Sequence, residues 1–332
     1  MQYLELSRPH DLLVRRLLWD TELTTDLLLF YTQKQADKRI IELLNLKHLE
    51  CKSPVAIDEQ LIEGIGDLRF TTSFKGSKRK SNVILLFEHQ SSIDLRLRLR
   101  GLNYIVQSYN QFEETRKGNE KFPYPVVVVL YHGTTSWKHL PEWDELIDIV
   151  PGVKTGLLDY QLILIDISIL KRDEFKGHPI VQALLEALQL ASEKRLAQEF
   201  DRVIDRIALV KDDPRAPGWS RSFCRYALAV AKIGTERVIR AFSKILTEEE
   251  AHEMTMTTAQ ELILEGEARG KAKGKAEGKA EAVLTVLRTR FDKIPKRVEQ
   301  SIRKISDLST LDSWTAQATT CRSLDEFAKS LR

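Results

Sequence analysis

Runs of apolar residues along the chain predict the strands of a central sheet. Two segments, 65–74 and 83–90, are rich in β-branched, aromatic and aliphatic residues and are bounded by polar stretches that contain glycine. The charged segment between them predicts a turn, so we expect these two strands to form a hairpin. The segments 125–133 and 160–169 are almost unbroken apolar runs, which are typical of strands buried on both faces.

Apolar residues at helical spacing predict helices around these strands. Leucines recur in this way from Leu12 onwards, and again over 24–31 and 40–49. After the hairpin, apolar residues repeat at helical intervals and are expected to form the buried face of a helix: Leu95, Leu99, Leu102, Val106 and Tyr109. A hairpin followed by a helix and a buried strand indicates a mixed α/β sheet with a parallel crossover.

The second half of the chain has a helical pattern throughout. Helical periodicity extends from Pro179 to about Ile245, and a break at 213–218 divides it. Glycine then recurs at every fourth position among lysine, glutamate and alanine, at Gly266, Gly270, Gly274 and Gly278. This repeat predicts either a flexible charged linker or a helix whose glycines let another backbone approach closely, and we favour a partly helical spacer.

These patterns divide the chain into four expected parts. They are a core over 1–175, a helical extension over 176–262, a spacer over 263–281 and a small helical domain over 282–332. The last part has a thin hydrophobic core, because it contains only about fifty residues. We therefore expect it either to dock on the main body or to associate with a second copy as a homo-oligomer.

Composition narrows the class of protein. With 332 residues and a hydrophobic fraction of 42%, the chain can form roughly two domains with a proper core. It contains no run of about 18 apolar residues and no signal-peptide pattern at its start, so we expect a cytoplasmic protein without a membrane partner. Cys51, Cys224 and Cys321 lack the paired spacing of zinc or disulfide motifs. The net charge of +3 is too small to indicate nucleic-acid binding by itself.

Two carboxylates are expected to face each other across the predicted hairpin. Asp67 and Glu88 lie at nearly equal distances from the middle of the turn, so regular antiparallel pairing makes them cross-strand neighbours. Strand side chains alternate, so Glu88 and Gln90 share one face while His89 points to the other. Opposed carboxylates repel each other, and a hard divalent cation with oxygen ligands relieves that repulsion. The hairpin therefore predicts a cation site.

Several other polar residues have both a functional and a structural interpretation. Arg96 and Arg100 form either a solvated basic face or a phosphate-contacting side of the helix after the hairpin. His132 and His10 are either phosphate contacts or, as we favour, satisfied structural histidines. Asp166, inside the apolar run 160–169, is either a supporting carboxylate near the site or a strand-end cap.

Five segments together carry a family resemblance. They are Arg8-Pro9-His10-Asp11, Gly66-Asp67-Leu68, Leu86-Phe87-Glu88-His89-Gln90-Ser91-Ser92, Val129-Leu130-Tyr131-His132-Gly133 and Leu164-Ile165-Asp166. In these segments the chain resembles the recombination-promoting nucleases, also called YhgA-like putative transposases, of the PD-(D/E)XK nuclease superfamily. The resemblance covers about residues 1–175, and the tail from Gly266 is similar to the spacer and helical domain often appended to such proteins.

The resemblance implies a fold and a site. The implied fold is a restriction-endonuclease-like mixed sheet flanked by helices, followed by an all-α region and a small helical C-terminal domain. Asp67 and Glu88 are implied ligands of Mg²⁺ or Mn²⁺, completed by Gln90 and the main-chain carbonyl near His89. Gln90 stands where the superfamily has lysine but agrees with the family pattern. Asp11 resembles the family's N-terminal motif acid and is expected to contribute through a water.

The implied function is a metal-dependent DNA endonuclease with a recombination-promoting, mobile-element or phage-defence role. Glutamine can orient a water molecule but lacks the charge with which lysine stabilises the transition state, so more of the catalysis falls on the metal. The alternative is a non-catalytic interaction or assembly protein on a degraded nuclease fold. The acids at positions 67 and 88 favour the first function, whereas Gln90 and the modest charge favour the second.

Overall fold

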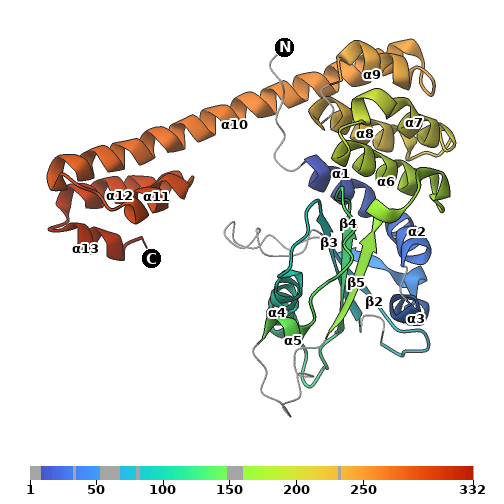
Figure 1. Cartoon of the computed structure of the whole chain (residues 1–332), viewed down its shortest axis with the longest axis horizontal. Helices are drawn as coiled ribbons and strands as arrows, with labels where there is room; N and C mark the ends of the chain where they lie inside the picture. The colour runs from blue at the N-terminus through green and yellow to red at the C-terminus, as the bar shows by residue number, and fades with distance from the viewer. Residues whose placement is uncertain are drawn as a thin grey trace. The chain divides into compact units, whose positions relative to one another are not determined.

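The computed structural model describes residues 9–32, 35–52, 68–79, 83–147, 160–230 and 233–331. The chain divides into two compact units, Met1–Ala259 and Gln260–Arg332. The first unit contains a mixed sheet with helices on both faces and a helical extension (Figure 1). The second unit is entirely helical over its described residues. The α/β architecture and the helical C-terminal region expected from the sequence are thus confirmed.

The described sheet has five strands in the order β1-β2-β3-β4-β5. Their bounds are β1 Glu50–Lys52, β2 Leu68–Thr72, β3 Val83–Gln90, β4 Tyr124–Tyr131 and β5 Gln161–Asp166. The pairs β1/β2 and β2/β3 are antiparallel, whereas β3/β4 and β4/β5 are parallel. The predicted hairpin and the parallel crossover are therefore both confirmed. Most of β3 and β4 is buried, which explains their continuous apolar sequences.

Helices cover both faces of this sheet. The helices of the first unit are α1 Pro9–Leu18, α2 Thr21–Tyr31, α3 Gln35–Leu43, α4 Leu97–Thr115, α5 Trp143–Leu146, α6 Pro179–Ser192, α7 Leu196–Ala208, α8 Ala216–Val230 and α9 Thr235–Phe242, with short 3-10 turns at Leu46–His48, Ile167–Ile169 and Arg172–Glu174. On one face, Leu85 and Phe87 join a core with α1, α2 and α6. On the other face, which α4 covers (Figure 1), Leu86 packs with Tyr104 and Ile105.

The orientation of α4 differs from the one predicted. Leu95, just before the helix, is 58% exposed, and Leu99 is 56% exposed, although both were assigned to the buried face. The buried side instead contains Gly101, where an added Cβ would collide with the hydroxyl of Tyr160. The buried Arg98 donates from Nε to the carbonyl of Pro141 over 2.7 Å. The close approach of the Tyr160 side chain at Gly101 and the buried guanidinium of Arg98 therefore decide which side of α4 packs, against the leucine spacing.

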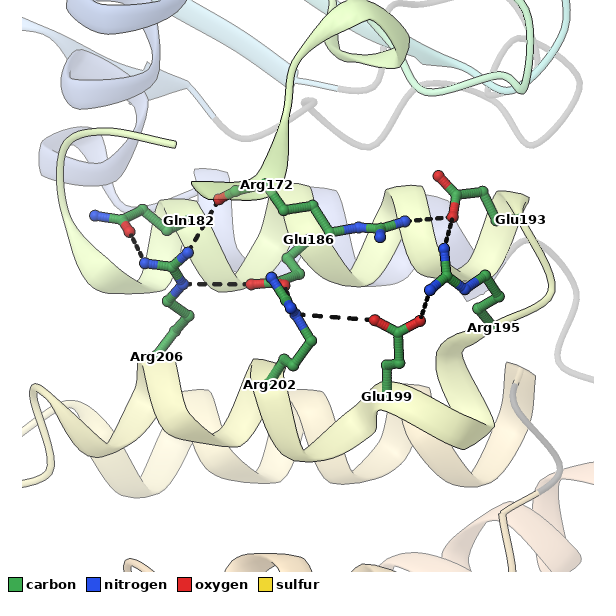
Figure 2. Close-up of polar contacts among 8 residues, drawn as sticks. All are labelled: Arg172, Gln182, Glu186, Glu193, Arg195, Glu199, Arg202 and Arg206. Atoms are coloured by element: carbon green, nitrogen blue, oxygen red, sulfur yellow. Dashed lines mark hydrogen bonds and ion pairs between the residues drawn. The ribbon is translucent and has the colours of Figure 1, made fainter. Parts of the chain in front are cut away.

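A chain of ion pairs joins α6 to α7 in the helical extension (Figure 2). At its centre is Glu186, which is fully buried and accepts from Arg202 Nε at 2.5 Å and from Arg206 Nε at 3.3 Å. The remaining members of the chain are Arg172, Gln182, Glu193, Arg195 and Glu199. Because a carboxylate buried without cations would be costly, these contacts fix α6 against α7.

The second unit is built on the end of a long helix. Helix α10 runs over Glu248–Phe291 and is followed by α11 Lys296–Lys304, α12 Leu308–Thr320 and α13 Leu324–Lys329. The segment 263–281, expected to be a partly helical spacer, is helical throughout. Ala276 and Ala280 are buried in the small core of this unit, while an added Cβ at Gly274 would meet open space. None of the described helices is long and apolar enough to cross a membrane.

Candidate active site

The candidate site lies at the carboxyl end of β3, in the segment Glu88-His89-Gln90. Glu88 is only 4% exposed, and its Oε1 accepts a hydrogen bond of 2.5 Å from Gln90 Nε2. The two side chains therefore share one face of the strand, as the alternation predicts. This is the face that α4 covers, since Leu86 belongs to the same alternating set and packs against that helix. A buried carboxylate and an amide thus stand together beside an apolar core.

Arg100 from α4 also reaches this carboxylate. Its Nη2 forms an ion pair with Glu88 Oε1 and donates to the Tyr104 hydroxyl at 3.1 Å. Its Nη1 is 2.8 Å from Asp94 Oδ2. Arg96, the other predicted arginine, is exposed at the start of α4, where its backbone N–H donates to Asp94 Oδ1. The structure therefore brings Arg100 to Glu88 and leaves the side chain of Arg96 at the surface.

The second carboxylate oxygen of Glu88 has no hydrogen-bond partner among the described residues. This atom, Oε2, is buried, and such an orphaned acceptor is costly unless another group satisfies it. Asp67, predicted to be the opposing acid, lies outside the described residues, and the described register between β2 and β3 begins with Leu68 opposite Phe87. The pairing of Asp67 with Glu88 therefore stays a prediction.

The side-chain oxygen atoms at this site are suitable ligands for a hard divalent cation. A carboxylate oxygen without a partner, beside an amide, matches the oxygen ligands that Mg²⁺ prefers. Within the described ranges, however, no three His, Cys, Asp or Glu side chains are grouped so that they could hold a metal ion. A complete site on Glu88 therefore needs a further oxygen ligand, which is the role predicted for Asp67.

The opposite face of β3 carries a cluster of histidines that sequence reasoning missed. The His89 ring is stacked on His132 with centroids 5.8 Å apart, and the His10 ring lies 5.1 Å from His132. His89 Nδ1 is 3.9 Å from Asp11 Oδ1. One signal could have revealed part of this cluster: the carboxyl ends of adjacent parallel strands meet at one edge of a sheet, and His89 and His132 both lie there.

Burial makes two of these histidines hard to protonate. It lowers the pKa of His132 to about 3 and that of His10 to about 4, and the neighbouring histidines add to both effects. His10 Nδ1 shares a hydrogen bond of 2.7 Å with the Tyr226 hydroxyl, and Ser192 donates to the carbonyl of His132. These contacts favour the structural interpretation of both residues, although only His10 is satisfied as expected, because Nε2 of His132 is buried without a hydrogen-bond partner among the described residues. The wholly buried ring of His132 is also not placed at a surface where a DNA phosphate could contact it.

Two predicted acids have definite places in the structure. Asp11 is on α1 and lies against His89, so it is on the opposite side of β3 from Glu88. Its expected contribution through a water stays a prediction. Asp166 accepts hydrogen bonds at the end of β5, from the backbone of Ser168 at 2.9 Å and of Trp137 at 2.8 Å. Of its two interpretations, the strand-end cap is the one observed.

Comparison with known proteins finds a family whose profile matches this chain and a relative of similar sequence. The sequence profile of a family described as "Putative transposase, YhgA-like" matches residues 8–216, which include every predicted site residue. The "Inactive recombination-promoting nuclease-like protein RpnE" of Escherichia coli (strain K12) is 28% identical over 185 residues. That alignment covers 55% of this chain and 58% of the relative, so the chain spans somewhat more than half of that protein's length. No solved structure matches the chain.

Proposed function

The chain belongs to the family of YhgA-like putative transposases, and from this premise we propose that it is a metal-dependent DNA endonuclease that hydrolyses phosphodiester bonds. The proposal includes a recombination-promoting role and a place in the cytoplasm. The observation that carries it is the buried Glu88, which has one oxygen held by Gln90 and Arg100 and the other without a described partner. A buried carboxylate oxygen without a described partner is an available ligand atom for a cation.

Glu88, Asp67 and Gln90 have different roles in the proposed reaction. Glu88, Asp67 and the amide oxygen of Gln90 would hold Mg²⁺ or Mn²⁺. Such an ion supplies a Lewis acid and lowers the pKa of bound water. Gln90 fixes the orientation of the Glu88 carboxylate through its 2.5 Å hydrogen bond, while the surrounding apolar core limits access of bulk water. The low exposure of Glu88 strengthens every electrostatic interaction at the site.

The DNA backbone would approach from the start of α4. The exposed Arg96 lies there, close in sequence to Arg100. Lys75 and Lys78, in the turn before β3, are also exposed, but they lie at the far end of that strand from Glu88. Glu88 lies five positions after Val83, which corresponds to roughly 17 Å of strand. Arg96 is therefore the better candidate for a phosphate contact next to the site.

A plasmid-cutting assay tests this function. Supercoiled plasmid is incubated with Mg²⁺ or Mn²⁺ and the wild-type chain, Glu88→Gln, Asp67→Asn or the control Glu113→Gln, which removes an exposed acid that pairs with Arg116. We expect the control to cut like wild type and both site variants to lose roughly a hundredfold or more in rate. Equal cutting by wild type and Glu88→Gln would reject the site.

A non-catalytic assembly role is the second candidate, and one observation favours it. The E. coli relative is described as inactive, and Gln90 stands where a lysine would supply charge. Under this alternative, folded wild-type chain leaves the plasmid intact with either metal. Circular dichroism of the same preparation establishes that the chain is folded, so a negative assay then supports the assembly role.

A further inference from the structure

Arg100 lies between a buried acid and a partly exposed one. The side chain of Glu88 is 5% exposed and that of Asp94 is 23% exposed, whereas Arg100 itself is 39% exposed. Its Nη2 contacts Glu88 and its Nη1 contacts Asp94 at 2.8 Å. Asp94 is itself held by the start of α4, because its Oδ1 accepts from the backbone N–H of Arg96 at 2.9 Å. The guanidinium is therefore fixed at the mouth of the candidate site.

This contact differs from an ordinary surface ion pair on the same helix. Arg116, the C-cap of α4, and Glu113 form such a pair at 2.6 Å, in which the carboxylate side chain is 51% exposed, and pairs of this kind contribute little. Arg100 instead reaches a carboxylate on another element that water hardly touches. A buried carboxylate without a cation is strongly unfavourable, so some positive group must accompany Glu88. In this structure that group is Arg100.

The same carboxylate is the one on which the proposed metal site depends. We propose that Arg100 is a resident counter-cation that competes with the metal for Glu88 and thereby sets the metal affinity, an inference that rests on the proposed function. Arg100 and Gln90 occupy Oε1, which leaves Oε2 for the incoming ion. Asp94 holds the guanidinium close by when the metal enters. Arg100 thus acts through Glu88 as a positioning residue, and it supplies positive charge that Gln90 lacks.

Whether removal of Arg100 strengthens or weakens metal binding distinguishes this role from simple structural support. If Arg100 competes with the metal, its removal leaves Glu88 more attractive to a divalent ion, because two like charges no longer share one carboxylate. If Arg100 only keeps Glu88 in place, its removal disorders the ligand and weakens metal binding. Asp94 gives a second test, in which the expected change in metal affinity has the opposite sign. Without Asp94, the guanidinium of Arg100 keeps only Glu88 of its two acidic contacts and should compete more strongly with the metal.

Binding of Mn²⁺ to the full-length chain, followed by the electron paramagnetic resonance signal of free Mn²⁺, makes the measurement without DNA. The variants are Arg100→Gln, Arg100→Lys, Asp94→Asn and Glu88→Gln, with Arg116→Gln at the C-cap of the same helix as the control. We expect Arg100→Gln to bind Mn²⁺ at least about threefold more tightly than wild type and Asp94→Asn to bind it more weakly. Arg100→Lys and the control should stay near wild type, and Glu88→Gln should lose binding.

Thermal unfolding of the same variants provides a second readout. Without metal, Arg100→Gln should melt below wild type because Glu88 is then a buried charge without a cation. Saturating Mn²⁺ should raise its melting temperature by more than it raises that of wild type, since a ligand stabilises the folded state according to its affinity.

Two different failures can be told apart. If Glu88→Gln abolishes Mn²⁺ binding but Arg100→Gln binds it as wild type does, or more weakly, the counter-cation role is overturned and the metal site stands. If wild type and Glu88→Gln bind Mn²⁺ alike, the metal site of the proposed function fails and this inference fails with it. Should Arg100→Gln not fold, unchanged or tighter binding by Asp94→Asn overturns the inference instead.

Discussion

The rings of His89 and His132 lie nearly parallel, with their planes 5° apart, and they join the carboxyl ends of β3 and β4. His10 from α1 completes this cluster on the side of the sheet away from Glu88. His10 and His132, whose ring centroids lie 5.1 Å apart, cannot both be charged without strong repulsion. The cluster therefore links the stability of the first unit to pH.

Acidification should destabilise the protein through His10 and His132. Their pKa values in the folded state, about 4 and about 3, lie below the ordinary 6.5, so the unfolded chain takes up protons first as pH falls. The stabilisation is complete above about pH 6.5 and is lost towards pH 4, by roughly 2 kcal/mol per histidine at pH 5. Urea unfolding at pH 7.5, 6 and 5 should show this fall.

The matched variants for this prediction are His132→Gln and His139→Gln. His139 is exposed and pairs with Glu145, whose pKa is lowered by the backbone N–H of Glu142 and by His139; because this pair is open to solvent, replacement of His139 should change the pH dependence much less than replacement of His132. Replacement of His132 should reduce the slope of unfolding free energy against pH. Identical slopes for all three proteins would show that the cluster does not control the pH response.

Gly101 should be intolerant of substitution. An added Cβ at this position collides with Tyr160, whose hydroxyl donates to the carbonyl of Arg98 at 2.7 Å. We expect Gly101→Ala to lower the free energy of unfolding by about 1–3 kcal/mol through overpacking. The control is Gly218→Ala in α8, where the added methyl meets open space and should stabilise the helix by up to about 1 kcal/mol. Urea midpoints compare the two, and equal shifts would refute the packing argument.

The C-terminal unit is expected to associate with a second copy. Its core is small, with Leu284, Leu287, Ile302 and Phe327 among its buried residues. Small cores gain stability from association, so full-length chain should sediment as a homo-oligomer and a chain ending at Ala259 as a monomer. Analytical ultracentrifugation at several concentrations measures both masses. A full-length chain that remains monomeric throughout would contradict this role.

The strands could be predicted from the sequence, whereas the contacts between distant elements could not. β3, β4 and β5 are continuous apolar runs because the parallel part of the sheet is covered on both faces. The buried side of α4 was assigned wrongly because leucine spacing carries no information about the close approach at Gly101. The ion pair of Arg100 with Glu88 depends on how the chain turns between β3 and α4, which periodicity does not specify.

The placement of Glu88 and His89 on opposite faces of β3 affects how mutations at one face influence the other. Glu88 projects to the side of α4, and His89 projects to the side of α1, so the candidate chemistry and the histidine packing are separated by one strand. Under the proposed function, mutations of Glu88 that end cutting would therefore leave the packing at His89 in place. If the proposed nuclease activity is correct, a chain could lose it at Glu88 and keep a stable fold, so a preserved sheet would not by itself indicate preserved catalysis.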